Sequence, residues 1–248
     1  MKLLEVCVDS LASARAAAAG GADRLEVCSA LAIGGLTPYL ALVEQIKGEL
    51  NIPVRCLMRP RAGDFLYEPE EIAMLRAQIR QLSHAGADGF VIGCLTPEGE
   101  LDAEAMKPLI DACGGKGMTL HRAVDVSRDP VDTWRQAGSL GIDTVLTSGG
   151  AGSCLQGMDT IRRMLELRAA EGGPEVLIGA GVKASVIRQF REKLPGAQSF
   201  HMSGKTDVPS RMLFRRDGVP MGLPGLDEWH ISRTSREAIR QAREALDE

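Results

Sequence analysis

The chain lacks the features that mark several common protein classes. Aromatic residues make up only 4% of its 248 residues, too few for the stacking surface that binds single-stranded nucleic acid. Its net charge of -4 also lacks the basic excess of nucleic-acid-binding proteins. No apolar run reaches the ~18 residues of a membrane helix, and the N-terminus shows no secretory signal pattern. These absences predict a cytoplasmic protein with no nucleic-acid or membrane partner.

Several catalytic and metal-binding signatures are missing as well. The six cysteines never form Cys-x-x-Cys, and there is no Walker loop, no His-Glu-x-x-His and no Gly-x-Ser-x-Gly. No lysine lies in the predicted strands 117–125, 143–148 and 175–182, which disfavours a Schiff-base aldolase. A chain of this length needs no disulfides, so we expect reduced thiols.

Strand and helix patterns alternate along the whole chain. The strands are expected at 3–9, 23–28, 53–60, 89–95, 117–125, 143–148, 175–182 and 199–203. The helices are expected at 11–19, 38–49, 69–84, 103–112, 130–138, 155–170, 185–193 and 235–247. Such units predict a parallel sheet, and a count of eight favours an α/β protein with one (βα)8 TIM-type barrel domain over residues 1–248. A doubly wound sheet is the alternative, but the glycine fingerprint after the first strand is missing.

Residues 204–234 break this rhythm. They contain several turns with Pro or Gly and the cluster Arg211, Arg215 and Arg216. Long segments with little periodicity are uncommon in a compact domain unless they have a function. We therefore expect an irregular excursion at the C-terminal face of the barrel, which covers the mouth or forms a dimer contact. An ordered surface excursion without a function is the alternative.

The motif Leu-Glu-Val-Cys occurs twice, at 4–7 and at 25–28. Side chains alternate faces along a strand, so each Glu shares a face with its Cys. If Leu and Val pack under helices, the acids and the thiols point into the barrel. Soft thiolates select Cu(I) or zinc, and Cys7 and Cys28 lie on neighbouring strands. The pair is a candidate Cu(I) site, with two buried structural thiols as the alternative.

Other polar residues come late in the predicted strands, where active sites of such barrels lie. The candidate catalytic residues are Glu5, Glu26, Arg59, His121, Asp125 and His201. In an enzyme, Glu26 or Glu5 would act as general base and His121 as its acid–base partner. Asp125 would orient His121, because both share a face of strand 117–125. The alternative is an internal network in which the acids pair with Arg59 and His121.

Glycines end the last two strands of the predicted barrel. The candidate anion-binding residues are Gly179, Gly181, Ser203 and Gly204. Loops after strands seven and eight form the usual phosphate site of such barrels. We therefore expect a small anionic or phosphorylated metabolite as the ligand of an enzyme of unassigned reaction. A requirement for glycine in tight turns is the alternative.

Taken together, the motifs resemble those of the CutC family, whose members are often called copper homeostasis proteins. The matching segments are 4–7, 21–28, 34–38, 58–65, 120–125, 145–149, 155–157 and 179–182. The resemblance runs from the N-terminus to the final helix. It implies a (βα)8-type barrel, a cytosolic homodimer and a role in copper handling, with Cu(I) bound at Cys7 and Cys28. Whether the protein is a copper-binding protein or an enzyme stays open at this point.

Overall fold

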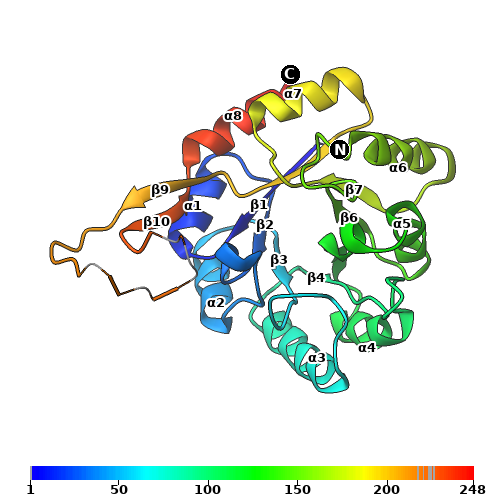
Figure 1. Cartoon of the computed structure of the whole chain (residues 1–248), viewed down its shortest axis with the longest axis horizontal. Helices are drawn as coiled ribbons and strands as arrows, with labels where there is room; N and C mark the ends of the chain where they lie inside the picture. The colour runs from blue at the N-terminus through cyan, green and yellow to red at the C-terminus, as the bar shows by residue number, and fades with distance from the viewer. Residues whose placement is uncertain (1, 217, 220, 223–224, 226) are drawn as a thin grey trace.

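A computed structural model describes residues 2–216, 218–219, 221–222, 225 and 227–248 of the chain. Eight parallel strands follow one another around a closed barrel (Figure 1). They are β1 (Leu3–Val8), β2 (Arg24–Val27), β3 (Val54–Leu57), β4 (Gly89–Ile92), β5 (Gly117–Leu120), β6 (Thr144–Thr147), β7 (Glu175–Ile178) and β8 (Ser199–Met202). Strand β1 pairs with both β2 and β8, which closes the ring. The predicted barrel is confirmed, and the doubly wound alternative is excluded.

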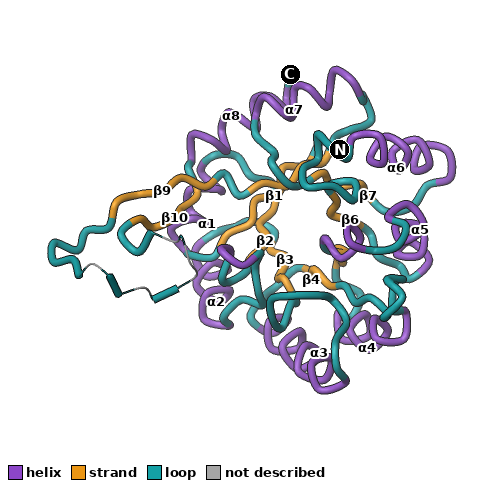
Figure 2. Tube along the Cα trace, in the orientation of Figure 1, coloured by secondary structure: helices purple, strands orange, loops and turns teal. Residues whose placement is uncertain are grey.

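Eight helices surround the strands as an outer layer (Figure 2). They are α1 (Leu11–Ala19), α2 (Leu40–Glu49), α3 (Pro69–His84), α4 (Ala103–Cys113), α5 (Pro130–Ser139), α6 (Met158–Glu171), α7 (Ala184–Lys193) and α8 (Arg236–Asp247). Two short 3-10 turns, η1 (Leu31–Ile33) and η2 (Arg122–Val126), follow β2 and β5. In the described part of the chain, no helix combines the length and apolar character needed to cross a bilayer.

The main core lies between the strands and the helices. Leu4, Val6, Leu25 and Val27 are fully buried in it, and full burial of such a side chain stabilises the fold by about 1.5–3 kcal/mol. The intervening residues of β1 and β2 take the opposite face and point into the barrel. The duplicated motif therefore places its apolar half under the helices and its acids and thiols in the barrel interior.

Strand β5 is shorter than expected, because it ends at Leu120. The His121 imidazole accepts a hydrogen bond from the Ala123 backbone N–H and caps the 3-10 turn η2. The prediction that 121–125 continues the strand is therefore wrong. The chain turns at the barrel mouth, and Asp125 no longer shares a strand face with His121.

The segment that we call the arm, residues 205–234, forms an antiparallel ribbon of β9 (Lys205–Pro209) and β10 (His230–Thr234). It extends sideways past α1, away from the barrel (Figure 1). Thr234 ties its base to α1 by donating its backbone N–H to Ser13 Oγ over 3.1 Å. No described arm residue lines the cavity at the mouth, so the described part of the arm does not form the expected cover. The dimer contact stays a prediction.

Candidate functional site

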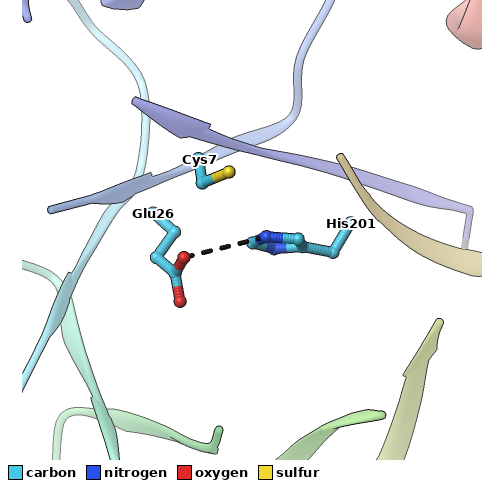
Figure 3. Close-up of side chains that lie close together, drawn as sticks. All are labelled: Cys7, Glu26 and His201. Carbon is cyan, nitrogen blue, oxygen red and sulfur yellow. Dashed lines mark ion pairs between the residues drawn. The ribbon is translucent and has the colours of Figure 1, made fainter. Parts of the chain in front are cut away.

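Three neighbouring strands bring a thiol, a carboxylate and an imidazole together inside the barrel. The strand register pairs Cys7 of β1 with Glu26 of β2, and Glu5 of β1 with His201 of β8. The ligand atoms of Cys7, Glu26 and His201 all lie within 4.8 Å of one another. Figure 3 shows the three side chains converging on one point, and we call them the Cys7 group.

His201 is held in one orientation by Glu5. Its Nδ1 lies 2.8 Å from Glu5 Oε1, so its Nε2 is turned toward Glu26, with Oε2 at 3.7 Å. Glu5 is fully buried and also accepts a hydrogen bond of 2.5 Å from Arg24 Nε. Burial alone would raise the pKa of Glu5, but Arg24 and His201 outweigh it and lower the pKa to about 2. Glu5 is therefore a permanent anion that positions the His201 ring.

Glu26 has a different environment, although it is the equivalent residue of the second motif. Burial raises the pKa of Glu26 to about 7, and the negative charge of Glu5 adds to this effect, while His201 opposes it. Burial would lower the pKa of His201, but the neighbouring Cys7 and Glu26 raise it well above its usual range. Glu26 and His201 therefore hold exchangeable protons at a place where their side chains border open space.

Cys28 does not join this group. It is fully buried, and its thiol donates to the Val8 carbonyl oxygen over 3.4 Å. Burial and the charge of Glu26 raise the pKa of Cys28 well above the usual range, which keeps the thiol protonated. It packs with Cys7, Leu57 and Val91 in a small apolar cluster. The structure thus brings Cys7 together with Glu26 and His201, while Cys7 and Cys28 also lie in one apolar cluster. The expected Cu(I) site at Cys7 and Cys28 stays a prediction.

A cavity of about 350 Å³ opens beside the Cys7 group. Its lining residues are Cys7, Glu26, Leu31, Ile33, Gly34, Leu57, Arg59, Phe65, His121, Arg122, Asp125, Val126, Leu146 and His201. The cavity joins the Cys7 group to His121, which follows β5 on the far side of the barrel. One space is therefore bordered by both sets of polar side chains.

His121 is 4% exposed. Its Nδ1 accepts the Ala123 N–H at 3.2 Å, while Nε2 has no hydrogen-bond partner among the residues that the structure describes. Burial, together with the positive charge of Arg59, lowers the pKa of His121 to about 3. The ring is therefore neutral at physiological pH, and its Nε2–H is left to serve as a donor.

Arg59 lies beside His121 and makes none of the expected pairs with the acids. Its Nη1 donates to the carbonyl oxygens of Ile33 and Gly35, both at 3.1 Å, and its guanidinium lies 5.3 Å from the centre of the Phe65 ring. Its Nε is a buried donor that lacks a partner within the described chain. The partners of Arg59 are neutral, so its positive charge is not balanced by them.

Asp125 lines the cavity but does not orient His121, so the expected pairing of these two residues is wrong. Its carboxylate accepts hydrogen bonds from Thr147 Oγ1 and from the backbone N–H groups of Ser148 and Gly150, and it forms an ion pair of 2.7 Å with Arg122. These bonds tie the turn η2 to the end of β6. Asp125 therefore shapes the mouth of the barrel.

The predicted anion-binding residues Gly179, Gly181, Ser203 and Gly204 do not line the cavity. The Gly179 N–H already donates to the Thr147 oxygen over 2.9 Å. A Cβ at Gly179 would lie 2.6 Å from Leu146 Cδ1, and one at Gly204 would lie 2.5 Å from Ile239 Cδ1. Close packing therefore accounts for these two glycines. The positive φ of Gly181 (82°) and Gly204 (54°) fits the alternative, a requirement for glycine in tight turns.

Two residues of the site were missed by sequence reasoning. Arg24 shares a strand face with Glu26 and pairs with Glu5, so strand alternation alone could have found it. Phe65 stacks against His121 with ring centres 4.7 Å apart. It lies in an irregular loop, and no periodic pattern places such a side chain.

Comparisons with known proteins agree with this architecture. The model of the CutC family matches residues 2–206. A human protein named copper homeostasis protein cutC homolog is 41% identical over 220 residues, which cover 89% of this chain and 80% of the human one. A CutC family protein of Vibrio campbellii is 39% identical over 98% of both chains. The crystal structure of CutC from Streptococcus agalactiae superposes with a TM-score of 0.76 at 27% identity, over 82% of this chain and 99% of that one.

Proposed function

The chain belongs to the CutC family, and we propose that it takes part in copper homeostasis by binding Cu(I) at Cys7 and His201. The observation that carries this proposal is the convergence of three ligand atoms within 4.8 Å. The name of the human relative, a copper homeostasis protein, supports copper as the metal. The copper ion is the cargo of this protein.

The donor set suits a soft monovalent ion. Thiolate sulfur selects Cu(I), and imidazole nitrogen binds copper well. Because the pKa of His201 is raised, Cu(I) would displace the proton of its Nε2, so the affinity should fall as the pH is lowered. The contact of His201 with Glu5 is the carboxylate–histidine arrangement that orients metal ligands in many sites. Glu26 lies beside these two residues and supplies a further oxygen. The same three residue types also bind Zn²⁺, so zinc is the competing outcome of the test.

The test is an anaerobic Cu(I) titration against a competing chelator. We expect Cys7→Ser to weaken Cu(I) binding by roughly 100-fold or more, because it removes a direct ligand. Cys28→Ser should stay within about threefold of the wild type, as should the control Cys113→Ser, which changes a buried thiol of α4. Equal losses in Cys7→Ser and Cys28→Ser would favour the thiol pair instead. Binding that is indifferent to Cys7→Ser, or a preference for Zn²⁺ over Cu(I), would contradict the proposal.

An enzyme of acid–base type is the second candidate function. Glu26, with a pKa of about 7, shares the cavity with the neutral His121, and a base with a pKa near the working pH transfers protons efficiently. The test is a turnover screen of small anionic metabolites with the wild type and with Glu26→Gln. A product that Glu26→Gln fails to form would support the enzyme. A screen in which both proteins behave alike would count against it.

We further propose that the protein acts as a homodimer in the cytoplasm. The six cysteines are free and buried, which suits a reducing compartment. The arm exposes the apolar side chains Met212, Leu213 and Phe214, which supports a contact with a second copy. Light scattering on the wild type and on Leu213→Ser/Phe214→Ser tests this contact. A wild type that is monomeric at micromolar concentration would contradict it.

A further inference from the structure

We propose that His121 and Arg59 form a second binding site at the barrel mouth, which holds the carboxylate of a small organic acid. The site faces the same cavity as the Cys7 group but borders it from the other side of the barrel. Its ligand is a short-chain carboxylic acid such as an α-keto acid. The inference supplies a binding step for the second candidate function, and it requires no metal.

The His121 ring has one nitrogen without a hydrogen-bond partner among the described residues. A backbone N–H can only donate, so the bond from Ala123 requires a lone pair on Nδ1. The proton of the neutral ring therefore sits on Nε2. This donor is buried and lacks a partner within the described residues. Most buried donors in proteins are satisfied, and an unsatisfied one costs about 1–3 kcal/mol. An oxygen atom of a ligand in the cavity would remove this cost.

The positive charge of Arg59 is not balanced by the groups that bind its guanidinium. The guanidinium bonds to carbonyl oxygens, which are neutral, and its Nε is a second buried donor without a partner in the described chain. Of the two acids that line the cavity, Asp125 is paired with Arg122 and Glu26 faces His201. A positive charge at the wall of a small cavity favours an anionic ligand. Phe65 contacts both the Arg59 guanidinium and the His121 ring, which places these two side chains on one wall of the cavity.

The number of free donors and the size of the cavity indicate which kind of anion fits the site. Two N–H donors, one on a neutral ring and one on a cation, match the two oxygens and the single charge of a carboxylate. A phosphate ester has three terminal oxygens and up to two negative charges, which is more than these two donors satisfy. The volume of about 350 Å³ is at the low end for ligand pockets. Leu57, Val126 and Leu146 line it and would pack against a short carbon chain.

The test is a calorimetric titration of the copper-free protein with pyruvate. Two variants separate the donor at Nε2 from the cap at Nδ1. In His121→Asn, the amide oxygen replaces Nδ1 and keeps the bond from Ala123, but the donor at Nε2 is lost. In His121→Gln, the longer amide restores an N–H at the position of Nε2. His230→Asn, on the exposed surface of the arm, is the matched control.

We expect saturable binding to the wild type, a loss of about tenfold or more in His121→Asn and recovery to within about threefold in His121→Gln, since a hydrogen bond to a charged group is strong. Arg59→Lys, which keeps the charge but lacks Nε, should also weaken binding, and it replaces His121→Asn if that variant does not fold. Three results would overturn the inference: no saturable binding at millimolar pyruvate, equal binding by wild type and His121→Asn, or tighter binding of inorganic phosphate. Because no copper is added, this outcome is independent of the Cu(I) titration.

Discussion

The floor and the mouth of the barrel both contain buried charges, but they differ in how those charges are paired. At the floor, Arg55 of β3 donates to Thr119 Oγ1 at 2.6 Å, to Thr144 Oγ1 at 3.2 Å and to Asp143 Oδ1 at 2.8 Å. At the mouth, the Cys7 group converges on open space, and His121 and Arg59 each retain a buried donor with no partner in the described chain. A buried charge alone therefore does not mark a binding site, whereas an unpaired polar group that faces a cavity does.

The floor is built around the Arg55 side chain. A Cβ at Gly117 would lie 2.5 Å from Arg55 Nη2, and one at Gly89 would lie 3.0 Å from Arg55 Cγ. These two glycines leave the room that the guanidinium occupies. An internal network thus exists at the floor and is made of residues that the sequence did not single out. The pairs that the alternative expected, an acid with Arg59 and Asp125 with His121, do not form among the described residues.

The largest expected effect is a loss of stability when the Arg55 network at the floor is disrupted. Arg55→Ala should lower the free energy of unfolding by about 3 kcal/mol, because it removes one partner of a largely buried network. Urea denaturation measures this loss. Arg15→Ala, which breaks an exposed pair with Glu49, is the control and should leave the denaturation midpoint nearly unchanged. A stable Arg55→Ala that no longer binds Cu(I) would erase the distinction between floor and mouth.

The second effect is on the affinity for Cu(I) and tests whether Glu5 holds the His201 ring in position. Glu5→Gln should weaken Cu(I) binding by roughly 10- to 100-fold, because the charged partner that orients the imidazole is lost. The control is Glu175→Gln in β7, where the carboxylate accepts from Ser199 and lies outside the cavity. Chelator competition on both variants provides the measurement. Equal affinities would mean that Glu5 does not act through His201.

The third effect separates a structural acid at the mouth from a functional one. Asp125→Asn should lower the free energy of unfolding by about 2 kcal/mol, since the amide cannot accept all the bonds that the carboxylate accepts. The pKa of His121, followed by NMR of its ring protons, should remain depressed, because Asp125 does not bond to the ring. A pKa that changes by more than about one unit would show that the two residues are coupled after all.

The last effect is absent at neutral pH and appears only on acidification. The pKa of His121 is about 3 in the folded protein and ~6.5 in the unfolded chain. Between these values the unfolded chain takes up a proton that the folded protein does not. The free energy of unfolding therefore decreases as the pH is lowered. The wild type should therefore lose roughly 1.4 kcal/mol per pH unit relative to His121→Gln below pH 6.5.

Thermal unfolding at several pH values measures this difference. His84→Gln, at the exposed end of α3, controls for the loss of a histidine and should follow the wild type. A His121→Gln protein whose stability runs parallel to that of the wild type from pH 6.5 to 4 would show that the folded protein tolerates a charged imidazole at this position.

Much of the architecture follows from local pattern. Helices α1 and α3 lie at the predicted bounds, and the strands lie within their predicted ranges, because apolar periodicity is a local property of the chain. The inward direction of Glu5 and Cys7 follows from strand alternation in the same way. His121 and Asp125 were placed wrongly because one bond between His121 and a backbone N–H ends β5 early.

The sequence by itself therefore determined the number of units, the closed barrel and the strand face on which Glu5, Cys7 and Glu26 lie. Only the tertiary structure decided which of these side chains meet. Closure of the barrel sets β8 beside β1, so that His201 reaches Glu5 across 196 residues and completes the Cys7 group. Cys28, one strand away from Cys7, turns instead to the Val8 carbonyl. Spacing along the chain carries no information on such contacts, because they depend on strand register and on where each buried donor finds an acceptor.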